Sequence, residues 1–437
     1  MAYTDVVKKM LNTAIDELAM VPNKFAVHPG KDFTRNRKLC FKDFILLLLT
    51  MEGDCIREEL YRFFGRSRDT PKKAAYCNQR AKLKADSLLY LLYTFTQKFS
   101  RKLYKDKYSL VACDGSVADI FRDETDKDTY FPPNNKSPRG FNQIHINALY
   151  SVLDKKFLDV LIQPCRKRNE YQAFCQMIDR VDNSIPSIYL ADRGYASYNN
   201  FAHVMAHNQY FLIRCTDVKT SRLLGFSVDN VKELDFHVDR ILTRSYSKKK
   251  RLHPERAEDY RYICQEVPFD YIDSECTEFH MPLRIVRIEI ADNTYENLIT
   301  NLPDVEFDMD ELKKLYHMRW DQETAYRDLK YPLCLKAFHS KKYKYIVQEV
   351  YARAIMFNYC SEITMKVEIP NKKRKLQYKV NFAQAIKICR DHLRNRNDKV
   401  PIDATGLIAN NIEPIRPGRT YRRQARFKLP MSFCYRN

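Results

Sequence analysis

Residues 109–116 read SLVACDGS, a short apolar run that ends at Asp114. Residues 187–195 read SIYLADRGY and repeat this arrangement, with Asp192 directly after the apolar run. Continuous apolar runs of this length, bounded by Gly and polar residues, are typical of strands that are buried on both faces. We therefore predict two buried strands, each followed by an aspartate where α/β sheets place functional side chains. Taken singly, either aspartate could instead be a turn former or a helix cap.

The segments around these two strands predict a mixed sheet flanked by helices. Residues 144–153 (IHINALYSVL), 157–163 (FLDVLIQ) and 210–215 (YFLIRC) have the patterns of further strands. Residues 169–181 and 200–207 have helical spacing. The resulting order, β-β-β-α-β-α-β, indicates an α/β (α+β) fold.

We predict five parts along the chain. They are a helical, basic N-terminal domain (residues 1–105), the first part of the core (106–215), an antiparallel β-rich insertion (216–305), the second part of the core (306–365), and a basic C-terminal region for DNA contact and dimerisation (366–437). In the first part, one long helix is expected from Thr70 to about Phe99, with Arg80 on its exposed side. That part is either a DNA-binding module or a helical cap on the core.

Composition excludes several classes of protein. With 45% hydrophobic and 30% charged residues among 437, the chain can bury a core and is not a disordered tail. Its longest wholly apolar run, residues 44–49, is far too short to span a bilayer, so no membrane partner is expected. The 13 cysteines include no C-x-x-C pair, which favours reduced thiols over structural zinc. The first residues, MAYTDVVKKM, lack the pattern of a signal peptide, and no phosphate-binding G-x-x-x-x-G-K-[ST] loop occurs, so we expect a cytoplasmic protein without a nucleotide cofactor.

A formal net charge of +20 predicts a polyanionic partner, nucleic acid before membrane. Much of the excess lies after residue 365, where 18 Lys and Arg residues face 5 Asp and Glu residues. Two dense runs lie there: Lys372-Lys373-Arg374-Lys375, and RPGRTYRRQARFK, which contains Arg416, Arg419, Arg422 and Arg423. Clustered charge with interleaved aromatics favours phosphate contact, and the alternative is a solvated basic tail.

A third acidic residue, Glu323, lies on a helix that is expected to run unbroken from about residue 308 to 330. At about 100° per residue, Glu323 shares one stripe, about 60° wide, with three other functional side chains. These are Tyr316, Arg319 and Lys330. The alternative is a solvated face in which Arg319 and Glu323 form a weak i,i+4 pair. The only tryptophan, Trp320, falls off the stripe and is expected in the core.

Asp114, Asp192 and Glu323 could converge on one site, where three carboxylates would repel each other unless a cation neutralised them. Mg²⁺ prefers oxygen ligands and keeps several waters, so three carboxylates suffice. Two such ions about 4 Å apart can activate a nucleophile and stabilise the leaving oxygen of a phosphodiester. Other candidates have structural interpretations: Asp119, Asp154 and Asp159 are expected in turns or at the surface, and His145 packed or hydrogen-bonded on a strand.

The pattern Tyr316-x2-Arg319-x3-Glu323-x6-Lys330 resembles the signature of bacterial insertion-sequence DDE transposases of the IS-four family. The motifs at Asp114 and Asp192 resemble the two aspartate motifs of that family. The gap of 131 residues between Asp192 and Glu323 fits the β-rich insertion that the family carries there. The resemblance covers residues 108–330 and implies an RNase H-like core.

The resemblance implies a cut-and-paste transposase in which Asp114, Asp192 and Glu323 bind two Mg²⁺ ions, which Mn²⁺ could replace. Water would free a 3′-OH at the transposon end, and this 3′-OH would then attack the target. The implied partner is double-stranded DNA, both transposon ends and target, gripped by a homodimer at the bacterial nucleoid. The DNA contacts near the cut would be Tyr316, Arg319, Lys330 and Arg193.

Two alternatives remain open at this stage. One is a catalytically silent DNA-binding protein derived from a transposase, against which the intact set of carboxylates argues. The other is an RNase H-like nuclease that cleaves DNA without strand transfer.

Overall fold

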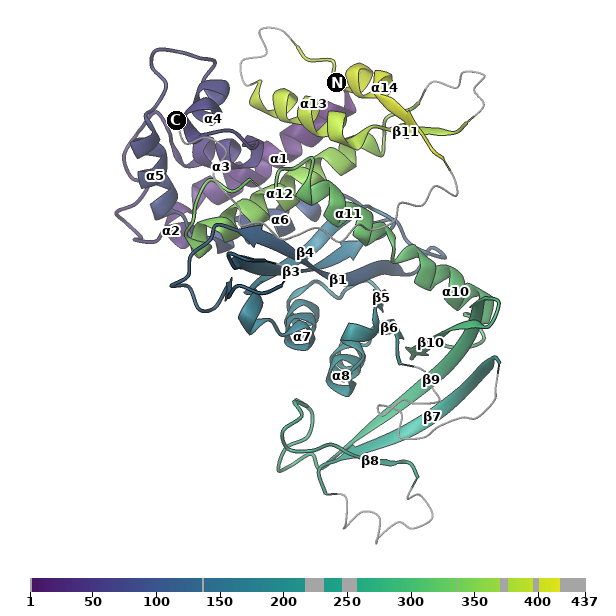
Figure 1. The fold of residues 1–437 in the computed structure, drawn as a ribbon. Coiled ribbons are helices and arrows are strands. Elements are labelled where there is room, and N and C mark those ends of the chain that lie inside the picture. Colours follow the sequence, from purple (N-terminus) through teal and green to yellow (C-terminus); the bar gives the residue numbers. More distant parts are fainter. Residues whose placement is uncertain are drawn as a thin grey trace.

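A mixed ten-stranded sheet runs through the centre of the computed structural model (Figure 1). The structure describes residues 2–135, 137–216, 232–245, 258–335, 337–369, 376–395 and 401–416. The strand order is β2-β3-β1-β5-β6-β10-β9-β7-β8, and β4 pairs with β3. The strands are β1 Ser109–Ile120, β2 Tyr130–Phe131, β3 Phe141–Ser151, β4 Lys156–Pro164, β5 Ser187–Ala191, β6 Tyr210–Arg214, β7 Leu234–Thr243, β8 Tyr260–Tyr262, β9 Glu278–Ala291 and β10 Thr294–Thr300. The predicted α/β class, with a mixed sheet flanked by helices, is confirmed.

The core of the sheet combines parallel and antiparallel pairing. Strand β5 is parallel to both β1 and β6, whereas β3 is antiparallel to β1 and β4. Helices α7 (Glu170–Arg180) and α8 (Tyr198–Ala206) pack together below β3, β5 and β6 (Figure 1). Apart from the additional two-residue strand β2, this is the predicted β-β-β-α-β-α-β order.

One boundary in this core was predicted wrongly. Strand β1 does not end before Asp114 but continues to Ile120, because its polar second half pairs with β3, from Asp114 opposite Ala148 to Ile120 opposite Asn142. A local stretch such as GSVAD carries little strand signal, and the partner strand supplies the stabilisation. Asp114 therefore lies inside the strand, at the point where its parallel pairing with β5 stops.

The predicted antiparallel insertion consists of β7, β9 and β10, with the short β8 parallel to β7. It does not form a separate sheet, because β10 pairs with β6 and so continues the central one. Arg284 on β9, only 2% exposed, donates hydrogen bonds of 2.8 and 2.6 Å to the carboxylate of Asp235 on β7. The long β7–β9 ribbon projects from the body in Figure 1.

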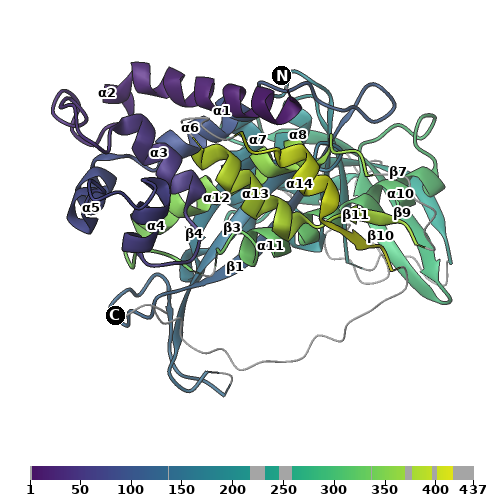
Figure 2. The same ribbon diagram turned by 90° about the horizontal axis from the view of Figure 1, so that it is seen from above.

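Six helices form the described N-terminal part, and α1, α3 and α6 pack on the long, buried helix α12 (Tyr343–Thr364) (Figure 2). The six are α1 Tyr3–Met20, α2 Pro22–Phe25, α3 Phe41–Thr50, α4 Ile56–Phe63, α5 Lys73–Lys82 and α6 Asp86–Thr96. The expected single helix from Thr70 to Phe99 is therefore wrong. The chain turns between α5 and α6 because Leu83 forms a bridge with Ala26. One apolar cluster joins these helices to α12 and to β3 and β4 of the sheet, which makes this part a cap on the core.

The expected exposure of Arg80 is also wrong. Arg80 is 2% exposed, and its guanidinium donates hydrogen bonds to Glu349 on α12 (2.6 Å) and to the main-chain oxygen of Tyr345 (2.7 Å). Glu349 also accepts from Arg353 and His339, and these partners hold its pKa well below the ordinary value despite its burial. Arg80 is thus a buried partner of α12.

The C-terminal part of the described chain also packs on the body. Helix α13 (Phe382–Arg394) lies against α12 and α3, and Ile386 and Cys389 are fully buried. Helix α14 (Ala404–Asn410) packs on α13, and β11 (Tyr378–Val380) pairs with β12 (Ile412–Pro414). Among the described residues, no helix is long and apolar enough to cross a membrane.

Candidate active site

Asp114 and Asp192 are brought together by the register of two parallel strands. Cys113 on β1 pairs with Ala191 on β5, and this is the last pair of that ladder. The next residue on each strand is the aspartate. Because parallel strands run in the same direction, both carboxylates lie at the same edge, where the strands separate.

Local hydrogen bonds to the backbone orient both side chains. Asp192 caps a single turn of 3₁₀-helix (Arg193–Tyr195) and accepts a hydrogen bond of 2.8 Å from the Gly194 N–H. Asp114 Oδ1 accepts a hydrogen bond of 2.8 Å from the N–H of Gly115. Arg193 is exposed beside this turn, whereas Tyr195 is buried beneath it.

Helix α11 (Asp321–Lys330), which carries Glu323, lies directly on β1. The Tyr326 hydroxyl donates to the main-chain oxygen of Asp114 (2.7 Å), and Lys330 Nζ donates to Ser116 Oγ (2.6 Å). These contacts fix the helix over the strand that carries Asp114.

The pKa of Asp114 responds to the charged groups that lie near it. The pKa of Asp114 is raised to about 6, chiefly by burial and also by the charges of Asp192 and Glu323, although the Gly115 N–H and Arg319 act in the opposite direction. All three predicted carboxylates therefore lie within one electrostatic neighbourhood, with Arg319 as the nearby cation.

The helix that was expected to run unbroken to Lys330 is interrupted at Arg319 and Trp320. It forms α10 (Met309–Met318) and α11, with a tight connection between them. At this connection the N–H groups of residues 319, 320, 322 and 323 bond to carbonyl oxygens three residues earlier, as in a 3₁₀-helix. The four signature residues therefore do not share the single helix face that was predicted from a rotation of about 100° per residue.

The interruption separates the signature residues into two environments. Tyr316 is 2% exposed and packs in an apolar cluster against the sheet. Arg319 is 5% exposed, with its guanidinium 5.5 Å from the Tyr316 ring and 5.3 Å from the Trp320 ring. Glu323 and Lys330 lie on α11 and are half-buried. Trp320 is 49% exposed, so its expected place in the core was wrong.

The donor set of this site suits a hard divalent cation, because its three side chains offer carboxylate oxygens alone. Burial is the main cause of the raised pKa of Asp114, and repulsion from Asp192 and Glu323 adds to it; a bound cation would relieve this repulsion. In the part of the chain that the structure describes, no three His, Cys, Asp or Glu side chains stand close enough together to hold a metal ion. Cation binding would therefore require these side chains to move towards one another.

Comparison with known proteins identifies the family. The model of the transposase DDE domain matches residues 105–359, which include both aspartates and Glu323. The chain belongs to this family. No curated protein matches the sequence. Among solved structures, a piggyBac transposase synaptic complex with hairpin DNA aligns with a TM-score of 0.45 and 9% identity, covering 95% of this chain and 87% of that one.

The structure also shows polar contacts of the transposase core that sequence reasoning did not find. Glu170 begins α7 and lies 3.0 Å from His145 Nε2. Its signal was weak, since an acidic residue in the first turn of a helix is common. His145 is buried and hydrogen-bonded, as predicted. Asp159, expected in a turn or at the surface, is fully buried in an ion pair with Arg180 (2.6 Å), which was missed because Arg180 is distant in sequence.

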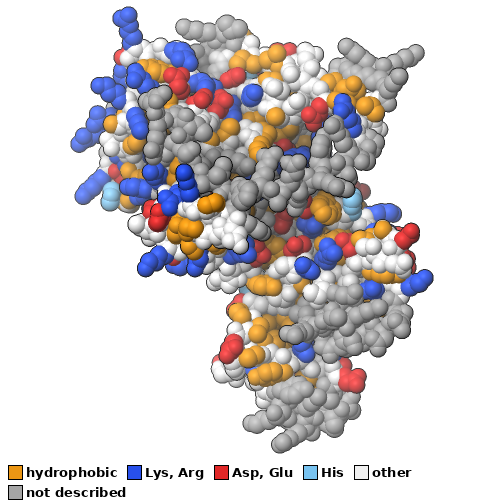
Figure 3. All heavy atoms as spheres, viewed as in Figure 1, with side chains coloured by type: hydrophobic (Ala, Val, Ile, Leu, Met, Phe, Trp, Pro, Cys, Tyr) orange, Lys and Arg blue, Asp and Glu red, His pale blue; other side chains and the backbone are white. Residues whose placement is uncertain are grey.

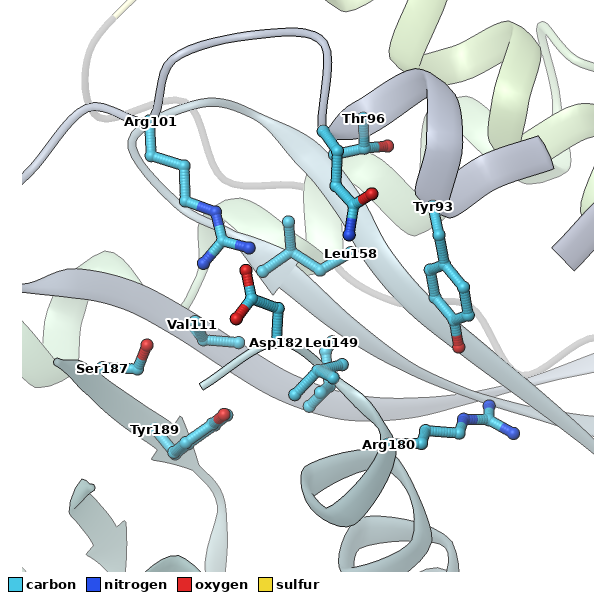
Figure 4. A pocket seen from close by; sticks show the side chains of 12 residues that line it. Tyr93, Thr96, Arg101, Val111, Leu149, Leu158, Arg180, Asp182, Ser187 and Tyr189 are labelled. Carbon is cyan, nitrogen blue, oxygen red and sulfur yellow. The ribbon is translucent and has the colours of Figure 1, made fainter. Parts of the chain in front are cut away.

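Other features of the transposase lie away from this edge. A cavity of about 80 Å³ opens beside Ser187, the first residue of β5, and so at the opposite end of the parallel strands from Asp192 (Figure 4). Of the predicted basic contacts in the tail, Arg416 is exposed after β12. Arg419, Arg422 and Arg423 lie outside the described residues.

Proposed function

We propose that this transposase cleaves DNA at transposon ends and transfers the freed 3′-OH to target DNA, with Asp114, Asp192 and Glu323 as its acidic catalytic residues. One observation carries this proposal. The two aspartates follow the last parallel pair of β1 and β5, and the helix of Glu323 is attached to the same strand β1.

The three carboxylates would hold two Mg²⁺ ions, or Mn²⁺ in their place. When bound, such ions activate the attacking water or 3′-OH and stabilise the leaving oxygen. The chain supplies the rest of the site. The charge of Arg319 lowers the pKa of Asp114, and Arg319 would neutralise a phosphate next to the cut. Lys330, oriented by Ser116, would contact a flanking phosphate.

Double-stranded DNA is the proposed partner, and the net charge of +20 supports it. Lys and Arg side chains gather over the N-terminal helices on the face shown in Figure 3. Four of them line a cavity of about 560 Å³ beside α4 and α5: Arg57, Arg68, Lys72 and Lys73. Trp320, exposed next to Arg319, offers a ring on which a base could stack. A homodimer would bring two transposon ends together, in the bacterial cytoplasm at the nucleoid.

The test is a cleavage and joining assay with a labelled duplex that carries the ends of the transposase's own element. We expect nicking that requires Mg²⁺ or Mn²⁺, leaves a 3′-OH at the boundary and is followed by joining to a plasmid. Asp114→Asn, Asp192→Asn and Glu323→Gln should each abolish cleavage and retain DNA binding.

Other outcomes would contradict parts of the proposal. Binding without cleavage in either metal would indicate a silent DNA-binding derivative. Cleavage without joining would indicate a nuclease. Unchanged cleavage by the Glu323→Gln variant would refute the role of α11.

A further inference from the structure

A fourth acidic side chain lies at the edge of the sheet that carries Asp114 and Asp192. We propose that Glu170, oriented by His145, belongs to the active site and takes part in binding the divalent cation on the Asp192 side. This inference rests on the proposed function, because it concerns the same cation. Four observations carry it.

The first is that the start of α7 is fixed in place. Asn169 caps the helix by accepting a hydrogen bond of 3.0 Å from the Gln172 N–H. The amide side chain of Gln163, near the end of β4, accepts from Asn169 N (3.1 Å) and donates to Asn169 O (3.3 Å). Asn147 on β3 donates to the same side chain of Gln163 (3.2 Å). Glu170 therefore leaves the backbone from a defined position over β3 and β4.

The second observation is the buried partner of Glu170. His145 is 3% exposed, and its Nε2 lies 3.0 Å from Glu170 Oε1 and 3.1 Å from Asn147 Oδ1. Both neighbours of Nε2 are acceptor oxygens, so Nε2 carries a proton and donates it to them. The contact directs the Glu170 carboxylate inward, towards the strands, although its side chain stays 32% exposed.

The third observation is that two glycines make room for this arrangement. A Cβ on Gly115 would lie 2.5 Å from His145 Nε2, so only glycine fits next to Asp114. A Cβ on Gly194 would lie 3.0 Å from Asp192 Oδ1 and 3.5 Å from Glu170 Oε2. The carboxylates of Asp192 and Glu170 thus approach the same point from two sides.

The fourth observation is an unsatisfied polar group beside the same space. Tyr195 is 1% exposed, and its hydroxyl has no nitrogen or oxygen partner among the residues that the structure describes, although the weakly polar Cys113 thiol lies beside it. It faces Gly115, where a Cβ would lie 3.3 Å from the hydroxyl oxygen. Buried polar groups without partners are costly, and they mark places where a ligand or its water completes the hydrogen bonding.

The simpler role for Glu170 is to stabilise the N-terminus of α7 through the helix dipole. That role needs only a negative charge near the first turn, and it gives no reason for a buried histidine partner or for the approach to Asp192. The two roles also predict different effects on cation binding, which can be measured without DNA.

The experiment measures Mn²⁺ binding to the full chain by electron paramagnetic resonance and calorimetry, and the Mg²⁺ dependence of end cleavage. Glu170→Gln should weaken Mn²⁺ binding by about tenfold or more and shift the Mg²⁺ requirement for cleavage upwards by a similar factor. His145→Gln should change the Mn²⁺ affinity and the Mg²⁺ requirement in the same directions but by smaller factors, because His145 acts only through Glu170. The matched control is Asp310→Asn, an exposed acid in the first turn of α10, which should change neither.

Mn²⁺ binding and Mg²⁺ dependence equal to those of the parent protein in a folded Glu170→Gln variant would overturn the inference. If Asp114→Asn still abolishes cation binding in that case, the proposed function stands and only the role of Glu170 fails. If the parent protein binds no divalent cation and cleaves no DNA end, the proposed function itself fails.

Discussion

The Tyr326 hydroxyl donates a hydrogen bond to the main-chain oxygen of Asp114 (2.7 Å) and lies 3.2 Å from that of Ile146. One side chain thus connects the helix of Glu323 to two strands of the sheet, and it is fully buried among them. The spacing between Glu323 and Asp114 depends in part on this contact.

Removing this hydroxyl alone should loosen the site without leaving a large cavity. Tyr326→Phe leaves a buried carbonyl without its donor, so we expect the free energy of unfolding to fall by about 1–2 kcal/mol and end cleavage to slow. Tyr331→Phe, at a tyrosine that is 60% exposed, is the matched control and should change neither. Denaturant titration and the cleavage assay measure both quantities. Equal behaviour of the two variants would show that α11 is positioned by other contacts.

The buried carboxylate of Asp114 is expected to lower the free energy of unfolding near neutral pH. Its pKa in the folded protein, about 6, lies above the ordinary value of 3.8, so the folded state binds this proton more tightly than the unfolded state. Stability from this residue is therefore present at low pH and is lost as pH rises from about 4 through about 6. Asp114→Asn should raise the free energy of unfolding at pH 7.5 by about 1–2 kcal/mol while abolishing cleavage.

The pH dependence separates this effect from a general one. The gain in the Asp114→Asn variant should shrink as pH falls towards 4, and Mg²⁺ should stabilise the parent protein more than the variant. Asp310→Asn, an exposed change of the same kind, should show neither trend. A gain that is independent of pH would contradict the assigned cause.

Arg80 tests whether the N-terminal helices are primarily a cap on the core. Removing one member of a buried ion pair leaves the other charge uncompensated, so Arg80→Ala should lower the free energy of unfolding by about 3–5 kcal/mol. Lys73→Ala, an exposed cation on the same helix, should leave stability unchanged. Thermal and denaturant unfolding provide the comparison. If Arg80→Ala were as stable as the parent but bound DNA more weakly, a solvent-facing role for Arg80 would be restored.

The sequence predicted well those features that depend on local patterns. Strand β5 has the predicted bounds, Ser187–Ala191, because an apolar run between polar breakers is a local signal. Helix α7 begins and ends within a residue of prediction, since Asn169 is a strong N-cap. For the candidate site, Asp192 directly follows β5 as predicted, whereas Asp114 lies within β1, and the pairing register of the two strands brings both aspartates to one edge of the sheet.

The features that were missed depend on partners far away in the chain. The burial of Arg80 depends on Glu349, 269 residues later, and no local pattern reveals such a partner. The second half of β1 depends on pairing with β3, and Glu170 gains its significance only when His145 and Gly194 lie beside it. The break at Arg319 and Trp320 follows from packing of α10 and α11 against different parts of the sheet, which helical periodicity does not show.

Trp320 provides an optical test of the DNA path. It is the only tryptophan, is 49% exposed and lies beside Arg319, so its fluorescence reports on this one place. We expect emission typical of a partly hydrated indole, accessible to acrylamide, and quenching when a transposon-end duplex binds. Trp320→Phe should fold normally, and Trp320→Ala should bind DNA more weakly by about 1–3 kcal/mol if a base stacks there. Fluorescence and acrylamide access that do not change on DNA binding would place the DNA elsewhere.

The contribution of the basic tail to DNA binding can be tested only with a cut placed outside the core. A truncation after Met365 would remove α13, whose buried Ile386 and Cys389 pack on the body, so loss of binding would then report unfolding.

A truncation after Arg416 removes residues 417–437, which contain six Lys and Arg residues and no Asp or Glu. If the tail binds phosphates, the affinity should fall, and the slope of log K against log salt should become shallower by about 0.9 for each phosphate that the tail no longer neutralises. A full-length variant with Gln at Arg419, Arg422 and Arg423 is the matched control for chain length and should show part of the same change. A salt slope unchanged in both variants, in protein of unaltered thermal stability, would show that the phosphate-binding residues lie on the body of the transposase.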